Sequence, residues 1–204
     1  PAMTAGKSLV RPLLLLLPVA AWGGMLLAPP LASKETPLRQ LTLASMRVAF
    51  EVPTGWVLDD ADAETLNLVQ LYGPWTKNLE HPKITLYYYG KDSFFHSKAD
   101  YLKSLMAKKR GEDDRTTTVG EAKVGGRTAR MVSVAYVDTL GIYSTHLHRE
   151  PVKETLVMLD APQGGFYVFQ YWAAQSIFKS HYPAFERLLD SAQLTSREPP
   201  PQTP

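Results

Sequence analysis

The sequence predicts an α+β domain, in which a central antiparallel β-sheet is covered by helices. Segments rich in β-branched and aromatic residues follow one another through short turns that contain glycine, which is typical of antiparallel hairpins. The two segments with helical spacing lie between and after these strands instead of alternating with each of them. This order favours an antiparallel sheet over a doubly wound parallel one.

The first strand signals come before the first helix. Residues 47–52 alternate polar and apolar side chains and stop at Pro53, and two further strands are expected at 66–72 and 83–89. Residues 87–89 are three consecutive tyrosines. Because side chains alternate along a strand, the middle tyrosine is expected on one face of the sheet and the outer two on the other.

A helix is expected after Ser97. This serine offers an N-cap, and Asp100 three residues later gives a weaker version of the capping box. Apolar side chains then recur at helical spacing at Ala99, Leu102, Leu105 and Met106.

Two hairpins follow this helix. Residues 123–124 lead through a Gly-Gly turn into a strand at 130–136. Strands at 154–159 and 166–172 flank a loop rich in turn formers, and both are apolar enough to be central in the sheet.

A second helix is expected near the end of the domain. Its apolar stripe consists of Ile177, Phe178, Tyr182, Phe185, Leu188, Leu189 and Ala192. Since proline lacks the N–H of a helical backbone bond, Pro183 fits best in the first turn. The sequence therefore predicts a break near Ser180 and a helix that begins after it.

Residues 1–33 are expected to form an N-terminal signal or anchor segment. Lys7 and Arg11 give a basic region, and residues 13–27 are apolar. Pro18 and a Gly-Gly pair interrupt this short stretch, which favours a cleaved signal over a spanning anchor. The location predicted from this segment is outside the cytoplasm, either periplasmic or secreted.

Three further regions complete the predicted organisation. Residues 34–41 are a polar leader, 42–195 a single α+β domain, and 196–204 a proline-rich tail.

Charge and cysteine content argue against several classes of function. The chain has 22 Lys and Arg against 20 Asp and Glu, and the segment before Ser33 contributes two bases and no acid, so the remainder is balanced. A balanced surface does not favour nucleic acid as a partner. The absence of cysteine excludes disulfides, thiolate metal sites and cysteine nucleophiles. No cofactor is expected.

The opening of the domain resembles a known family. Residues 50–56, Phe-Glu-Val-Pro-Thr-Gly-Trp, form a strand that ends in Pro-x-Gly-Trp, which resembles the start of the PsbP/DcrB-like superfamily. Segments 124–129, 165–169 and 185–191 fit the same pattern, so the resemblance covers about 50–194. It implies a PsbP-like sandwich of sheet and helices, an exported or lumenal location, and a binding or assembly role without catalytic residues.

Local catalytic signatures are absent from the sequence. It contains no Gly-x-Ser-x-Gly elbow, no phosphate-binding Gly-rich loop and no His-Glu-x-x-His helix. The acidic residues 112–114 are flanked by basic residues, which is typical of a solvated turn.

One segment carries residues with metal-ligating spacing. If residues 143–150 are extended, Ser144, His146, His148 and Glu150 share one face of the strand. The last three could be ligands of zinc or another borderline metal. The further ligand that such a site needs would come from elsewhere, such as His81, His96 or Asp138. The alternative is a solvated edge strand whose histidines make ordinary hydrogen bonds.

Together these features favour a non-enzymatic exported binding or assembly factor of the cell envelope. Its partner would be an unidentified envelope protein or small ligand. Two alternatives stay open: an exported metal-dependent hydrolase that uses His146 and His148, and a structural subunit tethered to the membrane by an uncleaved N-terminal segment. The hydrolase requires that at least two histidines and a carboxylate meet in one pocket.

Overall fold

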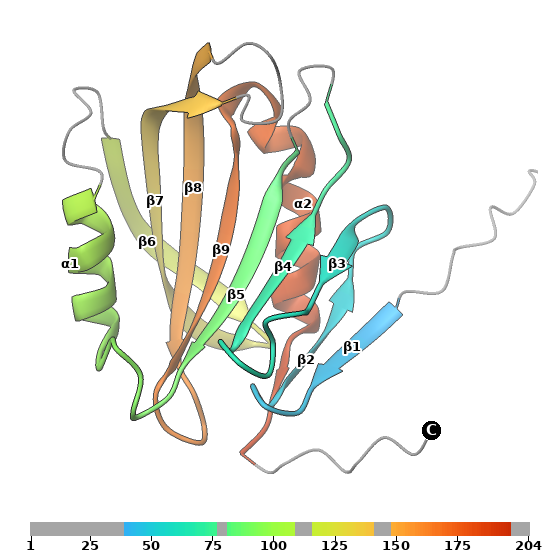
Figure 1. The fold of residues 1–204 in the computed structure, drawn as a ribbon, viewed down its shortest axis with the longest axis vertical. Coiled ribbons are helices and arrows are strands. Elements are labelled where there is room, and N and C mark those ends of the chain that lie inside the picture. Colours follow the sequence, from blue (N-terminus) through green and yellow to red (C-terminus); the bar gives the residue numbers. More distant parts are fainter. Residues whose placement is uncertain (1–38, 77–80, 109–115, 141–147, 197–204) are drawn as a thin grey trace, which may run out of the picture. The chain divides into compact units, whose positions relative to one another are not determined.

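Two antiparallel sheets and two helices make up the described part of the computed structural model, which comprises residues 39–76, 81–108, 116–140 and 148–196. All of these residues belong to the unit Thr36–Pro204. The helices are α1 (Lys98–Lys108) and α2 (Gln175–Ser191). They lie on opposite sides of the larger sheet, as Figure 1 shows. The predicted α+β class, an antiparallel sheet covered by helices, is confirmed.

The larger sheet has seven strands in the order β3-β4-β5-β9-β8-β7-β6. Its strands are β3 (Val57–Asp59), β4 (Leu68–Tyr72), β5 (Lys83–Tyr89), β6 (Thr116–Val124), β7 (Arg127–Leu140), β8 (His148–Asp160) and β9 (Phe166–Ala174). Every neighbouring pair is antiparallel. Both predicted hairpins are present, as β6–β7 and β8–β9, and β5 has the predicted bounds.

The smaller sheet has three strands in the order β1-β2-β10. These are β1 (Arg39–Leu43), β2 (Val48–Val52) and β10 (Gln193–Leu194). Arg39 pairs with Val52 at one end of β1. Residues 39–41 of the predicted leader are therefore part of this sheet.

Apolar side chains fill both faces of the large sheet. On the α2 side, the largest buried side chains include Phe50, Tyr167, Phe169, Tyr171 and Phe185. On the α1 side, the cluster includes Tyr101, Val132, Tyr136, Leu156, Phe166 and Val168. The three tyrosines of β5 divide as predicted, because Tyr88 packs on the α2 side while Tyr87 and Tyr89 pack on the α1 side.

The start of α1 has the predicted cap. The Asp100 amide donates a hydrogen bond of 3.1 Å to the Ser97 Oγ, which itself donates one of 2.7 Å to the Asp100 Oδ2. These bonds satisfy one free N–H of the first turn and place a carboxylate at the positive end of the helix.

The predicted break in the last helix is wrong. Helix α2 is continuous and begins at Gln175, with Pro183 in its interior. Side-chain packing explains the difference, since the buried Phe178 stacks on Tyr182 with ring centroids 5.3 Å apart. The Tyr171 hydroxyl also donates a hydrogen bond of 3.0 Å to the Phe178 carbonyl. These contacts fix the turns before Pro183, and they outweigh the one backbone bond that a proline removes.

No helix in the described residues has the length and apolar character that crossing a membrane requires.

Candidate functional site

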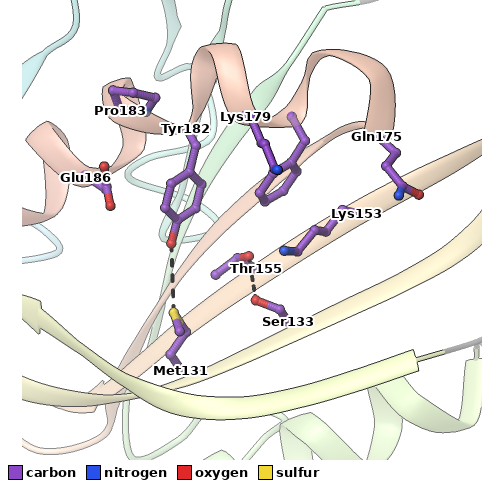
Figure 2. A pocket seen from close by; sticks show the side chains of 10 residues that line it. Met131, Ser133, Lys153, Thr155, Gln175, Lys179, Tyr182, Pro183 and Glu186 are labelled. Atoms are coloured by element: carbon purple, nitrogen blue, oxygen red, sulfur yellow. Dashed lines mark hydrogen bonds between the residues drawn. The ribbon is translucent and has the colours of Figure 1, made fainter.

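Helix α2 leaves a hollow beside it on the large sheet. Its buried side chains, Phe178, Phe185, Leu188 and Leu189, face the sheet. Next to this contact, Met131 and Ser133 of β7 are only half-buried. The hollow between the helix and these strands has a volume of about 480 Å³ and is shown in Figure 2.

The floor of the hollow carries hydroxyl groups. The Ser133 Oγ and the Thr155 Oγ1 lie 2.8 Å apart across β7 and β8, within hydrogen-bond distance. Beside them the Tyr182 hydroxyl donates to the Met131 Sδ at 3.9 Å (Figure 2). The floor therefore combines polar groups with the polarizable surfaces of a thioether and an aromatic ring.

Charged side chains border the hollow. The Lys153 Nζ lies 4.7 Å from the centre of the Phe178 ring, a cation–π contact. Lys179 and Glu186 come from the exposed side of α2. Burial raises the pKa of Tyr182, and the nearby Glu186 carboxylate raises it further, so this hydroxyl stays protonated as a donor at neutral pH.

A second hollow of about 480 Å³ continues the first along α2. The two share Met131, Tyr182 and Glu186, and the second adds side chains of β6 and of the end of α2. The added residues are Glu121, Ala122, Lys123, Leu189 and Asp190. Together the two hollows are called the α2 groove below.

Charge is distributed unevenly along the α2 groove. Lys153 and Lys179 lie in the first hollow, whereas Glu121 and Asp190 lie in the second, with Glu186 in both. The ion pair found among the described residues joins Lys98 to Asp160, and neither of these residues lines the groove. Among the described residues, the charged side chains of the groove therefore form no ion pair.

A buried carboxylate lies under the opposite face of the sheet. Glu154 of β8 is 0% exposed. Its carboxylate accepts a hydrogen bond from the Gln170 side-chain amide and another, of 3.4 Å, from the Tyr136 hydroxyl. Burial raises the pKa of Tyr136, and the negative charge of Glu154 adds to this. A carboxylate without exposed surface cannot meet a substrate directly, so Glu154 belongs to the polar core.

The structure describes only part of the segment that carries the predicted metal ligands. His146 lies outside the described residues, and so do the acidic residues 112–114. The backbone of His148 begins β8 and pairs with Leu140. Glu150 accepts a hydrogen bond of 2.9 Å from the Ser176 Oγ at the start of α2. The zinc site at these residues stays a prediction. Calorimetric titration of the metal-free protein with zinc tests it, and the double variant His146→Ala with His148→Ala is the comparison.

The other candidate ligands are dispersed over different elements. His81 stacks between Tyr72 and Trp75, with ring centroids 4.8 and 4.3 Å away. Burial lowers its pKa, and the positive charge of Lys83 lowers it further. His96 is exposed before α1, and Asp138 is in β7. Across the described ranges, no three His, Asp or Glu side chains form a group that could hold a metal.

The α2 groove was not predicted from the sequence. A signal for it exists in β7, where Val132, Val134 and Tyr136 form one apolar face and the alternate positions carry Met131 and Ser133. A strand that is apolar on one face and partly polar on the other indicates incomplete cover of the second face. The position of α2 over the sheet could not be obtained from that pattern.

Comparison with known proteins finds likenesses of fold. No family model matches the chain, and no curated protein matches it. The solution structure of the cyanobacterial PsbP (CyanoP) of Synechocystis sp. PCC 6803 aligns with a TM-score of 0.43 at 12% identity, over 78% of this chain and 92% of that one. PsbP, after which the superfamily suggested by the sequence is named, is thus among the solved structures that this chain is similar to.

Two other solved structures show similar values. The Saccharomyces cerevisiae Ran-binding protein Mog1p has a TM-score of 0.45 at 8% identity, over 77% of this chain and 95% of that one. LpqN, described as involved in cell envelope biogenesis of Mycobacterium tuberculosis, has a TM-score of 0.44 at 14% identity, over 79% of this chain and 87% of that one. Likenesses at these identities concern the fold alone.

Proposed function

We propose that this protein is a non-enzymatic, exported binding or assembly factor of the cell envelope, and that the α2 groove holds its partner. The observation that carries the proposal is the groove itself. It joins two hollows along one helix, combines apolar and hydroxyl surface, and has charged side chains that form no ion pair among the described residues. Such mixed concave surfaces are where proteins bind ligands and partners.

The chemistry of the groove supports binding over catalysis. A hydroxyl nucleophile needs an adjacent general base to be activated. The hydrogen-bond partner of Ser133 is Thr155, another hydroxyl. Among the described residues, neither hydroxyl is hydrogen-bonded to a histidine, lysine or carboxylate. The polar groups of the floor are therefore suited to orienting a bound molecule.

Export is proposed from residues 1–33. The basic pair and the apolar stretch that follows have the pattern of a secretory signal. Fractionation of the producing cells, with the intact mass of the recovered protein, tests this part. Protein that stays in the cytoplasm at full mass would contradict export.

Site-specific photocrosslinking in the envelope tests the role of the groove. A photoreactive amino acid replaces Lys179 or Glu186 in the full chain, and the matched control replaces Lys103, which is exposed on α1. We expect a discrete crosslinked product from the two groove positions and none from the control. The product should be lost when Ser133→Trp fills the floor. Absence of crosslinks at the groove, or equal crosslinks from Lys103, would exclude the groove as the binding surface.

A further inference from the structure

The length of the α2 groove sets the size of what it can hold. Its lining extends along α2 from Gln175 to Asp190. At a rise of 1.5 Å per residue these positions are about 22 Å apart along the helix axis. An extended chain rises about 3.3 Å per residue, so about seven residues span the same distance.

The ends of the groove differ in charge. Lys179 is on the N-terminal half of α2, and Lys153 lies on the strand below it, beside Phe178. Asp190 lies at the other end of the helix, with Glu121 of β6 lining the same hollow. Lys123 also lines this hollow and keeps its charge, while its Nζ donates a hydrogen bond of 2.6 Å to the Thr128 hydroxyl. The three carboxylates of the hollow, with Glu186 as the third, outnumber it. A bound molecule would thus meet positive charge at one end and negative charge at the other.

The surface between the charged ends suits alternating side chains. Apolar groups of Met131, Phe178 and Tyr182 are interspersed with the Ser133 and Thr155 hydroxyls. An extended chain directs every second side chain to one side. One set of its side chains would contact this floor while the other set faces solvent.

We infer that the α2 groove binds an extended segment of another protein, about seven residues long, that carries a basic side chain near Asp190 and an acidic side chain near Lys179. This inference rests on the proposed binding function and adds the chemistry of the partner. Opposite charges at the two ends fix the direction in which the segment lies. Charge arrangement of this kind contributes to specificity more than to affinity.

Selection from a displayed library of random heptapeptides tests the inference. The full chain is the target, beside a charge-exchanged variant that combines Lys153→Glu, Lys179→Glu, Glu186→Lys and Asp190→Lys. We expect the wild type to enrich peptides with basic residues toward one end and acidic residues toward the other. The exchanged variant should enrich the reverse order, and the control Lys103→Glu should keep the wild-type order.

Affinities of the enriched peptides give the second readout. Fluorescence anisotropy measures the affinity of a peptide that was selected on the wild-type protein. We expect the variant with four exchanged charges to bind this peptide about tenfold more weakly, since each exposed charge pair contributes only part of the binding free energy. The single variant Lys179→Glu should lower the affinity by a smaller factor. It replaces the variant with four exchanged charges if that variant does not fold. Circular dichroism checks folding of each variant.

Three results would overturn the inference. Failure to enrich any peptide excludes an extended segment as the occupant, and enrichment without a charge order excludes the direction. A dimer in sedimentation velocity that the fourfold variant abolishes would assign the groove to a second copy of this chain. The crosslinking experiment separates failure of this inference from failure of the proposed function. If the groove positions give crosslinks but no peptide is enriched, the groove binds a partner that is not an extended segment.

Discussion

Two adjacent glycines in the β6–β7 turn offer a matched test of how the hairpin is held against α2. Gly125 and Gly126 both have left-handed backbones, with φ of +54° and +78°. A Cβ at position 125 would lie 2.0 Å from the Ala192 carbonyl oxygen, whereas a Cβ at position 126 would have no heavy atom within 4 Å. We therefore expect Gly125→Ala to destabilise the protein far more than Gly126→Ala.

The expected magnitudes follow from these distances. The left-handed backbone costs either alanine about 1–2 kcal/mol. Gly125→Ala adds about 1–3 kcal/mol for overpacking. It also adds about 1 kcal/mol for the hydrogen bond of 2.8 Å that the Gly125 amide donates to the Leu189 carbonyl. We expect losses of about 3–6 kcal/mol for Gly125→Ala and about 1–2 kcal/mol for Gly126→Ala.

Equilibrium unfolding in urea, followed by tryptophan fluorescence, measures both losses. Equal losses would refute the reasoning, because they would show that the hairpin does not pack against the end of α2. That contact also borders the acidic end of the α2 groove, where Leu189 and Asp190 lie. Gly125→Ala should therefore weaken binding of the peptides selected on the wild type, and Gly126→Ala should not.

Three further predictions concern stability. Phe185→Ala removes a fully buried ring and should lower the free energy of unfolding in urea by about 3–5 kcal/mol. The control Phe94→Ala removes a ring that is 87% exposed and should change stability by less than about 0.5 kcal/mol. Similar losses for the two variants would contradict the assignment of the core. Ser97→Ala should cost about 1 kcal/mol because α1 loses its cap, and an unchanged urea midpoint would contradict that role. Burial raises the pKa of Tyr167 to about 12. An unfolded tyrosine ionises near pH 10, so this group's contribution is complete below that pH and is lost as the pH rises toward 12. Tyr167→Phe should therefore flatten the fall in stability over this range, and an unchanged slope would count against the shift.

Local sequence patterns were sufficient for most of the fold. The alternation in residues 83–89 predicted both the bounds of β5 and the faces of its tyrosines, because a strand has a fixed two-residue period. The cap at Ser97 was likewise predictable, since it depends on residues three apart. The start of α2 was not, because the turns before Pro183 are held by the stacking of Phe178 on Tyr182 and by a hydrogen bond from Tyr171 of β9.

The candidate site depended on contacts that the sequence does not encode locally. The spacing of His146, His148 and Glu150 predicted a metal site, which the described residues leave untested. The α2 groove instead depends on where the helix crosses the sheet. That crossing is set by the packing of Phe178 and Phe185, together with the contact of Gly125 with the end of the helix. Periodicity identifies the buried face of α2 but not the strands that it leaves uncovered.

The strand order has a consequence for how the chain folds as it is made. Strands β6, β7 and β8 each pair with the next strand in sequence, and β9 leads directly into α2. The lining of the groove therefore comes from one continuous stretch of sequence. Strand β5, in contrast, pairs with β9, where Lys83 lies opposite Trp172. Because the N-terminal part is synthesised first, one edge of β5 stays without its partner until β9 emerges. Ile84 and Leu86 belong to a core cluster that is incomplete until β9 and α2 have been made. Unpaired apolar edges promote aggregation. We therefore expect the nascent chain to depend on a holding chaperone until β9 is complete.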